Sequence, residues 1–317
     1  MTLINNDIRS AASFLKNGEL VAIPTETVYG MGANAFNPDA VKSIFAVKNR
    51  PFYDPLIIHT DSMDKIDQWG MFIPEILKPL TQKFWPGPLT VLMEKSWMIS
   101  DVVTAGLPRV AVRIPNHALT LEMLSLCDFP IAAPSANPFG YVSPTTADHV
   151  KKHFDGKISM ILDGGPCQIG IESTIVGVEN GEVVVYRLGG IAIEEIEMEV
   201  GEVVIQTSSS KPEAPGMLIK HYAPAKKVTA IESQEELNAI DKKGCAFILF
   251  DLNVDDVPED DIIYLSKASS HDEAAQNFYN ALRAWDDKDS IQSLIVQRMP
   301  DFGLGRAIND RLRRAVS

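Results

Sequence analysis

The sequence predicts an α/β protein of two domains, a mixed sheet with helices followed by a smaller, mostly parallel sheet of Rossmann-like type. Residues 1–200 alternate short apolar runs with helical patterns, and residues 227–317 repeat this alternation on a smaller scale. Between them, residues 201–226 contain three prolines and a run of three serines, which favours a linker. A length of 317 residues also suits two domains.

In the first domain, strands are expected where short apolar runs are bounded by turn residues. The runs are 20–23, 56–59, 89–93, 110–114, 131–133, 160–162, 174–178 and 183–187. Asn180-Gly181 separates the last two runs and is typical of a two-residue hairpin turn. Helices are expected over residues 6–17, 38–48, 74–84, 117–126 and 146–153.

The second of these helices has the clearest start. Asn37 can cap it, Pro38 suits its first position and Asp39 places an acid in its first turn. Its far end directs Lys48 and Arg50 back toward the segment that follows the first of these strands. Helix-end cations can also simply complement the helix dipole.

The last ninety residues are expected to run β-α-β-β-α-β-α. The strands are 228–231, 246–250, 262–265 and 294–297. One helix is capped by Ser233, and two others cover 271–285 and 304–315. Gly303-x-Gly305 lacks the third glycine of a dinucleotide fingerprint, so a plain turn is expected. The arginines near the C-terminus are expected to complement the dipole of the last helix rather than to bind a ligand: Arg306, Arg311, Arg313 and Arg314.

Composition argues against several classes of protein. The net charge of −13 opposes nucleic-acid binding, which usually needs a basic surface. No apolar run approaches the ~20 residues of a membrane helix, and a polar N-terminus favours a cytoplasmic location. The three widely spaced cysteines argue against a zinc site and a disulfide framework.

Paired hydroxyls follow the first of these strands. Pro24 must end the strand because it has no N–H, so Thr25 and Thr27 lie at its carboxyl end, where open α/β sheets hold ligands. Together with Lys48 and Arg50 they indicate recognition of a phosphate or a carboxylate. Capping of the strand end is the alternative for the two hydroxyls.

Further motifs extend this pattern along the chain. They are Lys48-Asn49-Arg50-Pro51, residues 84–90 (FWPGPLT), 110–115 (VAVRIP), 132–137 (AAPSAN), 172–175 (ESTI), 186–189 (YRLG), and 214–217 (APGM) with 220–224 (KHYAP). This ordered set resembles the YrdC-like family, and the whole chain is similar to its long, two-domain form, the threonylcarbamoyl-adenylate synthases. The resemblance implies a YrdC-like domain over 1–200, a linker or lid over 201–226 and a small Rossmann-like domain over 227–317.

The resemblance also implies a reaction. L-Threonine, bicarbonate and ATP would give threonylcarbamoyl-AMP, pyrophosphate and water, with Mg²⁺ offsetting the phosphate charge. The product would pass to partner proteins that make threonylcarbamoyladenosine in tRNA. The hydrogenase-maturation carbamoyltransferases contain a related domain, but their Cys-x-x-Cys motifs are missing from this sequence. A non-catalytic RNA-binding module is the other alternative.

By the resemblance, five residues contact L-threonine: Thr27, His59, Arg113, Ala133 (through its backbone) and Ser173. Arg113 interrupts an apolar strand and therefore needs an anion, either a structural carboxylate or that of threonine. His59 at a strand end and Ser173 at a strand start each have a structural alternative.

The resemblance assigns Lys48 and Arg50 to the reacting phosphate, and Ser135, Ser143, Arg187 and Tyr222 to ATP. A turn role is the alternative for the serines, and linker packing for Tyr222. His221 and Tyr222 are expected to cover the nucleotide. Two positions depart from the family pattern: Asp54 replaces the usual Asn, and Arg109 replaces Thr or Ser. Asp54 is expected to contact ATP through Mg²⁺ or ribose, and Arg109 either adds a phosphate contact or faces solvent.

Overall fold

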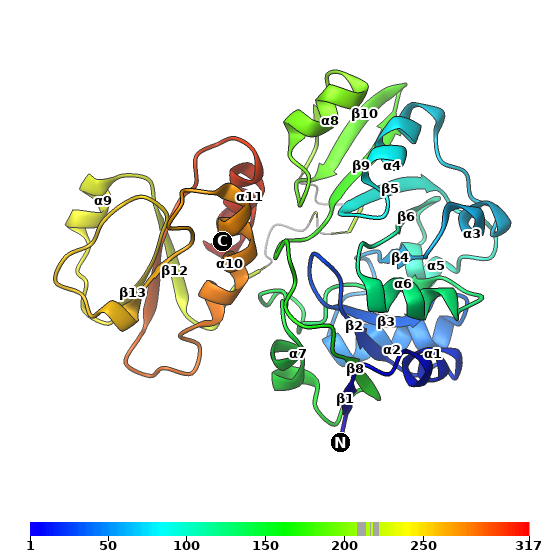
Figure 1. The fold of residues 1–317 in the computed structure, drawn as a ribbon, viewed down its shortest axis with the longest axis horizontal. Coiled ribbons are helices and arrows are strands. Elements are labelled where there is room, and N and C mark those ends of the chain that lie inside the picture. The colour runs from blue at the N-terminus through cyan, green and yellow to red at the C-terminus, as the bar shows by residue number, and fades with distance from the viewer. Residues whose placement is uncertain (208–213, 216, 218–221, 317) are drawn as a thin grey trace.

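The computed structural model describes residues 1–207, 214–215, 217 and 222–316. Figure 1 shows two α/β units joined by the linker. Helices α10 (His271–Arg283) and α11 (Leu304–Val316) of the C-terminal unit lie between its own sheet and the larger unit. This arrangement brings two C-terminal helices beside the first domain.

In the described part of the chain, the first domain forms an eleven-stranded mixed sheet with the order β1-β8-β2-β3-β7-β4-β6-β5-β9-β10-β11. The strands are β1 (Leu3–Asn5), β2 (Val21–Ile23), β3 (Gly30–Asn34), β4 (Ile57–His59), β5 (Leu89–Glu94), β6 (Arg109–Arg113), β7 (Ile131–Ala132), β8 (Met160–Leu162), β9 (Thr174–Glu179), β10 (Glu182–Arg187) and β11 (Val204–Ile205). The predicted mixed α/β class is confirmed.

Helices of the first domain cover parts of both faces of this sheet. They are α1 (Ile8–Lys16), α2 (Pro38–Lys48), α3 (Met63–Gln68), η1 (Glu75–Leu77), α4 (Lys78–Phe84), α5 (Asp101–Thr104), α6 (Ala118–Ser125), α7 (Ala147–Phe154) and α8 (Ile193–Val200). Asn37 caps α2 as predicted, because its side chain accepts hydrogen bonds from the N–H groups of Asp39 and Ala40. Asn49 then adopts a left-handed conformation with φ 53° and turns the chain sharply after α2.

Successive residues of the central strands enter different cores, because side chains alternate across a sheet. Ile58 of β4 belongs to the large core that the helices cover, whereas Ile57 belongs to a small cluster on the opposite face. That small cluster also contains Ala214 and Met217 of the linker, both fully buried. The described linker residues therefore cover part of the second sheet face.

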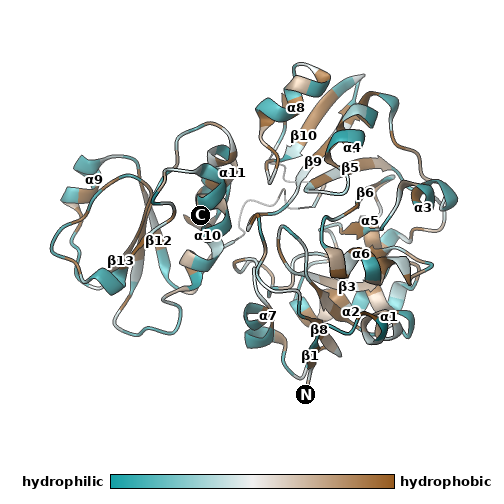
Figure 2. Cartoon of the chain, viewed as in Figure 1, coloured by the Kyte–Doolittle hydropathy of each residue, from teal (hydrophilic) through white to brown (hydrophobic). Residues whose placement is uncertain are grey.

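The C-terminal domain is a four-stranded sheet with the order β12-β15-β13-β14, and its described pairings are all parallel. Its elements besides α10 and α11 are β12 (Lys227–Ile231), α9 (Gln234–Ala239), β13 (Cys245–Leu249), η2 (Glu259–Asp261), β14 (Ile262–Tyr264) and β15 (Ser293–Gln297). The predicted small parallel sheet is confirmed. Apolar residues, brown in Figure 2, gather on the strands of both domains.

Every strand predicted for the first domain is present, and the hairpin at Asn180-Gly181 has positive φ at both residues, as a two-residue turn needs. Three strands were not predicted. β1 and β11 have three and two residues, and β3 is the glycine-containing run GMGAN, which has little strand propensity. The predicted domain boundaries stay a prediction, although β11 of the predicted linker pairs with β10 of the large sheet.

The prediction for the arginines of the last helix is wrong at two positions. Arg311 and Arg314 are almost fully buried and form ion pairs with Asp310. Arg311 also reaches Glu172 of the first domain. Their side chains point into the interior because buried carboxylates attract them more strongly than the weak, solvent-screened field of a helix end.

Cys127, Cys167 and Cys245 are buried free thiols. In the described parts of the chain, the helices are too short or too polar to traverse a lipid bilayer.

Candidate active site

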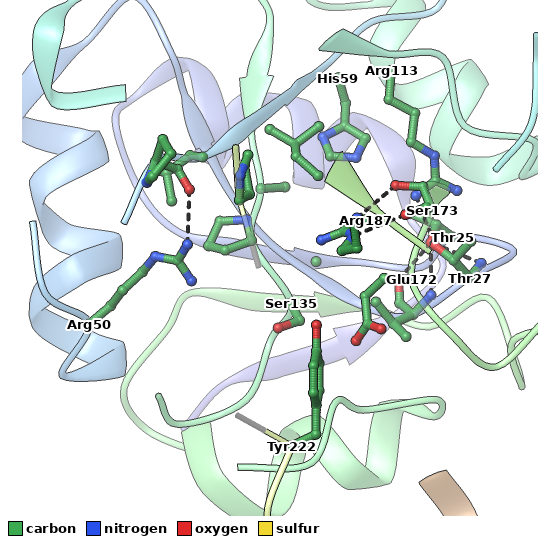
Figure 3. A pocket seen from close by; sticks show the side chains of 18 residues that line it. Thr25, Thr27, Arg50, His59, Arg113, Ser135, Glu172, Ser173, Arg187 and Tyr222 are labelled. Carbon is green, nitrogen blue, oxygen red and sulfur yellow. Dashed lines mark hydrogen bonds between the residues drawn. The ribbon is translucent and has the colours of Figure 1, made fainter. Parts of the chain in front are cut away.

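A buried cavity lies at the second face of the central strands (Figure 3). It is lined by Thr25, Thr27, Val28, Gly30, Arg50, Pro55, Leu56, Ile57, His59, Arg113, Ala133, Pro134, Ser135, Glu172, Ser173, Arg187, Pro215 and Tyr222. Nine of the thirteen residues predicted for the site therefore line one cavity, and the other four do not: Lys48, Asp54, Arg109 and Ser143.

The sheet register explains why residues distant in sequence meet here. His59 and Arg113 end the neighbouring parallel strands β4 and β6 and are paired in register, so they lie side by side on one face. Ser173 directly precedes β9, and Arg187 ends β10, which pairs antiparallel with β9. Thr27 follows β2, as predicted, but the cavity extends across the sheet face rather than along one edge.

Arg113 is held by partners on every nitrogen. Its Nη2 lies 2.7 Å from a carboxylate oxygen of Glu26, its Nη1 donates to the Thr27 hydroxyl at 2.8 Å and its Nε donates to the Gly87 carbonyl at 3.1 Å. Glu26 is therefore the structural carboxylate that the sequence left open as a partner. The Thr25 hydroxyl donates to the Val28 carbonyl at 2.6 Å, so the Thr27 hydroxyl donates its own proton to Thr25 at 2.8 Å.

His59 is neutral near pH 7. Burial and then the nearby Arg113 guanidinium lower its pKa from 6.5 to about 3. Its Nδ1 is buried and has no hydrogen-bond partner among the described residues. A buried polar atom without a partner is costly, so this nitrogen is available for a polar group of a ligand.

Ser173 connects two elements of the cavity wall. Its hydroxyl lies 2.7 Å from the Thr90 hydroxyl and accepts a hydrogen bond from Arg187 Nη2 at 2.9 Å. Arg187 Nε also donates to the Ser173 carbonyl at 2.9 Å. Burial lowers the pKa of Arg187 from its ordinary value, but the group stays cationic at neutral pH.

Glu172 is the lining residue that sequence reasoning missed. Its carboxylate accepts from Ser143 at 2.6 Å, from Tyr279 at 2.8 and 3.0 Å and from Arg311 Nε at 3.0 Å. The usable signal was an acid within the motif-bearing segment 171–175, which is bounded by two isoleucines. Glu26, which holds Arg113, has the same kind of signal beside Thr25 and Thr27.

Ser143, predicted to contact ATP, is fully buried and donates to Glu172 from outside the cavity. Asp54, with the same predicted ligand, is also fully buried and pairs with Arg50 at 2.9 Å. Arg50 Nη2 donates in addition to the Pro55 carbonyl at 2.9 Å, so its guanidinium is aligned along the wall of the cavity. Ser143 and Asp54 thus hold lining residues, a role the sequence did not indicate.

Lys48 is almost fully buried behind the cavity wall. Its ammonium donates to the carbonyls of Ser135 and Asn137 and so holds the loop that carries Ser135 into the lining. Burial, and then the charge of Arg50, lower the pKa of Lys48 well below its ordinary value. Direct contact of Lys48 with a reacting phosphate stays a prediction.

Arg109 lies at the other end of β6 from Arg113, about 13 Å along the strand at ~3.3 Å per residue. It donates to the Tyr186 hydroxyl at 3.1 Å and approaches Glu179 at 3.4 Å. Tyr222 and Ala133, in contrast, both line the cavity and are nearly fully buried. His221, predicted to act with Tyr222, lies outside the described residues.

The described residues do not form a protein metal site, because they contain no group of three His, Cys, Asp or Glu side chains that could hold an ion. Three carboxylates line the cavity or contact its lining arginines, and each is paired: Glu26 with Arg113, Asp54 with Arg50 and Glu172 with Arg311. Mg²⁺ usually binds phosphates and water with only one or two carboxylates. The predicted ion would therefore have to arrive with the phosphates of ATP.

Three guanidinium groups, Arg50, Arg113 and Arg187, converge on this one buried cavity (Figure 3). Such convergence is suited to a ligand with several anionic groups, because Arg binds carboxylate and phosphate in a bidentate manner. The volume of the cavity is about 50 Å³.

Comparisons with known proteins agree with this geometry. Residues 13–189 match the family model described as "Telomere recombination", named for Sua5, YciO and YrdC proteins, and residues 191–317 match "Threonylcarbamoyl-AMP synthase, C-terminal domain". The threonylcarbamoyl-AMP synthase of Pyrococcus abyssi is 41% identical over 97% of this chain and 93% of its own length. That of Bacillus subtilis is 38% identical over 99% and 94%.

A solved structure extends the likeness to three dimensions. The crystal structure of P. abyssi Sua5 complexed with L-threonine has a TM-score of 0.92 and 39% identity, covering 100% of this chain and 98% of that one. A P. abyssi Sua5 variant with adjacent histidine and tyrosine residues replaced by alanine has a TM-score of 0.89 at 38% identity, covering 100% and 96%. The chain belongs to the threonylcarbamoyl-AMP synthase family, in its long form with a YrdC-like domain and a Sua5 C-terminal domain.

Proposed function

We propose that this chain joins L-threonine, bicarbonate and ATP into threonylcarbamoyl-AMP, with release of pyrophosphate and water. The observation that supports this most directly is the convergence of Arg50, Arg113 and Arg187 with Thr27 and His59 on one buried cavity. The substrates carry a carboxylate, a hydroxyl and a triphosphate, which these guanidinium, hydroxyl and imidazole groups can bind. The family to which the chain belongs also acts on these substrates.

The threonine half of the site is proposed around Arg113. Arg113 would bind the carboxylate, with Glu26 moving or sharing the guanidinium, while the buried His59 nitrogen offers a partner for a polar group of the amino acid. Thr27 and Ser173 supply hydroxyls, and Ala133 supplies backbone. A site that pairs a substrate hydroxyl discriminates strongly against analogues that lack it.

The ATP half is proposed in the part of the cavity next to Arg50, and Arg187 lies where the two halves meet, since it donates to Ser173. Arg50 and Arg187 would bind phosphate, with Ser135 as a hydroxyl contact and Tyr222 against the nucleotide. The support for Lys48, Asp54 and Ser143 is indirect, because each holds a lining residue in place. Arg109 has the least support as an ATP contact, since it lies at the far end of β6.

In the proposed chemistry the threonine amine takes up CO₂ or bicarbonate to form a carbamate. A carbamate oxygen then attacks the α-phosphorus, and the bond from that phosphorus to the bridging oxygen of the pyrophosphate breaks. This transfer needs alignment and charge neutralisation more than a dedicated base, which suits a cavity with three arginines. Burial also protects the product, a mixed anhydride, from water. Mg²⁺ with ATP, a cytoplasmic location and transfer of the product to tRNA-modifying proteins remain predictions.

The decisive experiment measures pyrophosphate release from ATP and bicarbonate with and without L-threonine. We expect release to depend on threonine, to fall with serine, which lacks the methyl group, and to fall further with valine, which lacks the hydroxyl. Equal turnover of valine and threonine would refute the assignment of Thr27, His59 and Ser173. Tight RNA binding without any pyrophosphate release would instead favour the non-catalytic alternative.

A further inference from the structure

Two residues of the C-terminal domain, Tyr279 of α10 and Arg311 of α11, each contact the same two residues of the cavity wall. The Tyr279 hydroxyl and Arg311 Nε both donate to the Glu172 carboxylate. The Tyr279 ring also stacks on the Tyr222 ring at 5.8 Å and 21°, and the Arg311 guanidinium carbon lies 5.3 Å from the Tyr222 ring centroid. Glu172 and Tyr222 line the cavity, whereas Tyr279 and Arg311 do not.

These contacts are strong because they are buried. Arg311 and Tyr279 are fully buried, and Glu172 and Tyr222 are exposed by only 6% and 2%. A buried charge is costly unless it is paired, so removal of one partner of a buried ion pair is strongly destabilising. The wall residues Glu172 and Tyr222 are therefore held to one position as long as the C-terminal domain is docked.

The position of Glu172 determines where two predicted ligand contacts lie, Ser173 and Arg187. The next residue is Ser173, whose carbonyl and hydroxyl both accept hydrogen bonds from Arg187. The Glu172 carbonyl itself accepts from the Gly190 N–H at 2.9 Å, which ties this segment to the chain beyond Arg187. A shift of Glu172 would therefore move the Ser173 hydroxyl and the Arg187 guanidinium together.

We propose that Tyr279 and Arg311 are positioning residues of the active site, and that the C-terminal domain serves catalysis by holding Glu172 and Tyr222 against the bound substrates. This inference rests on the proposed function, because it concerns the same cavity. It assigns the second domain a role that requires no ligand of its own.

The ionisation of Glu172 makes the pH profile of activity a useful measurement, because a loss of packing alone would not change that profile. Burial alone would raise the pKa of Glu172, but the guanidinium of Arg311, then Arg187 and the Ser143 hydrogen bond lower it to about 2. Tyr222 and Tyr279 are the other titratable groups that face it, and burial raises the pKa of both. Glu172 is thus ionised throughout the neutral range, but without Arg311 its burial would favour the protonated form as the pH falls.

The test uses the full chain with Arg311→Met, Tyr279→Phe and Arg311→Lys. The matched control is Arg313→Met on the same helix, whose side chain is 54% exposed and pairs with Asp310. We expect Arg311→Met and Tyr279→Phe each to lower kcat/KM for threonine-dependent pyrophosphate release by about tenfold or more, since each loses a buried hydrogen bond to a carboxylate. Arg313→Met should match the wild type.

The pH profile separates positioning from general loss of stability. Activity of Arg311→Met should gain a decline toward acidic pH that the wild type lacks, and Arg311→Lys, which keeps the charge, should restore the wild-type profile. Glu172→Gln combined with Arg311→Met should lose less than the two single losses added together, because no unpaired charge is left buried. Thermal unfolding verifies that each variant is folded, and Tyr279→Phe keeps the ring packing should Arg311→Met fail to fold.

Folded Arg311→Met and Tyr279→Phe variants with wild-type kcat/KM and an unchanged pH profile would overturn the inference. Additive losses of Glu172→Gln and Arg311→Met would likewise show that the two residues do not act as a pair. A wild-type protein without threonine-dependent pyrophosphate release would instead refute the proposed function, and the positioning role with it.

Discussion

At the scale of a single residue, Arg113 has two roles that conflict, because two different carboxylates require the same guanidinium. In the structure its guanidinium neutralises Glu26 inside the protein, and in the proposed complex it binds the threonine carboxylate. Both partners are negative and both lie next to one buried cation. Ligand binding must therefore relocate or share Glu26.

Replacing Arg113 by Met should lower both stability and threonine affinity. A second substitution, at Glu26, can separate the two effects. The single variant leaves the Glu26 charge buried without a partner and should lose about 3–5 kcal/mol of unfolding free energy in urea titrations. The double variant Arg113→Met/Glu26→Gln should recover most of that stability while calorimetry still detects no threonine binding. Recovery of threonine affinity in the double variant would contradict the assignment of Arg113 to the substrate carboxylate.

His59 predicts a pH dependence of stability. Its pKa is about 3 in the folded protein and 6.5 in an ordinary environment, so the unfolded chain binds more protons between these values. Stability from the neutral, buried ring is fully present above pH 6.5 and is lost as the pH falls toward 3. The unfolding free energy should therefore be lower at pH 4.5 than at pH 7, and His59→Gln should make this difference smaller. His149, whose pKa is lowered to about 4, should retain a part of it.

At the scale of elements, the turn after α2 determines where Arg50 points. The left-handed Asn49 ends the helix, and Asp54 then holds the guanidinium at 2.9 Å before β4 begins. The acid at position 54 adds an ion pair with Arg50 to what an amide could provide. Its role is to orient Arg50, which agrees with its complete burial.

Asp54→Asn keeps the shape of the side chain and removes its charge. We expect ATP affinity to fall by about tenfold, because the buried ion pair that orients Arg50 is lost. Threonine affinity should stay unchanged, since Arg113 and Thr27 are held by other residues. Calorimetric titration with each ligand tests this, and an equal loss for both ligands would argue against a role confined to Arg50.

At the scale of the whole molecule, the linker and the C-terminal domain close one side of the first domain. Ala214 and Met217 pack on Ile57 and neighbouring residues of the sheet, and Tyr222 joins the core of the C-terminal domain. Pro215 of the linker and Tyr222 both line the cavity, so the described linker residues form part of its wall. A lid role of the linker stays a prediction, for which the prolines of the linker would lower the entropy cost of ordering.

Truncation after Gln206 tests this arrangement. The remaining first domain should fold and bind threonine, but it should release little pyrophosphate because Tyr222, Tyr279 and Arg311 are missing. Its uncovered apolar sheet face should also promote self-association, which light scattering would detect. Wild-type ATP affinity and product yield in the truncated protein would mean that linker and second domain are dispensable for the reaction.

Local sequence determined much of this protein. The Asn37 cap, the Asn180-Gly181 hairpin and the apolar runs of the central strands depend on residues a few positions apart, so periodicity and turn chemistry reveal them. The ordered motifs also determined the family. β3 was not predicted because its glycines have little strand propensity. Its place in the sheet comes from pairing with β2 and β7.

Only the tertiary structure decided which charges meet. Glu172 and Arg311 are 139 positions apart, and Arg113 reaches Thr27 across 86. Periodicity reports which face of an element is buried, but it contains no information about which buried cation a buried acid will find. The same limit explains why Arg311 was assigned to a helix dipole, and why the contacts of Asp54 with Arg50 and of Ser143 with Glu172 were not predicted.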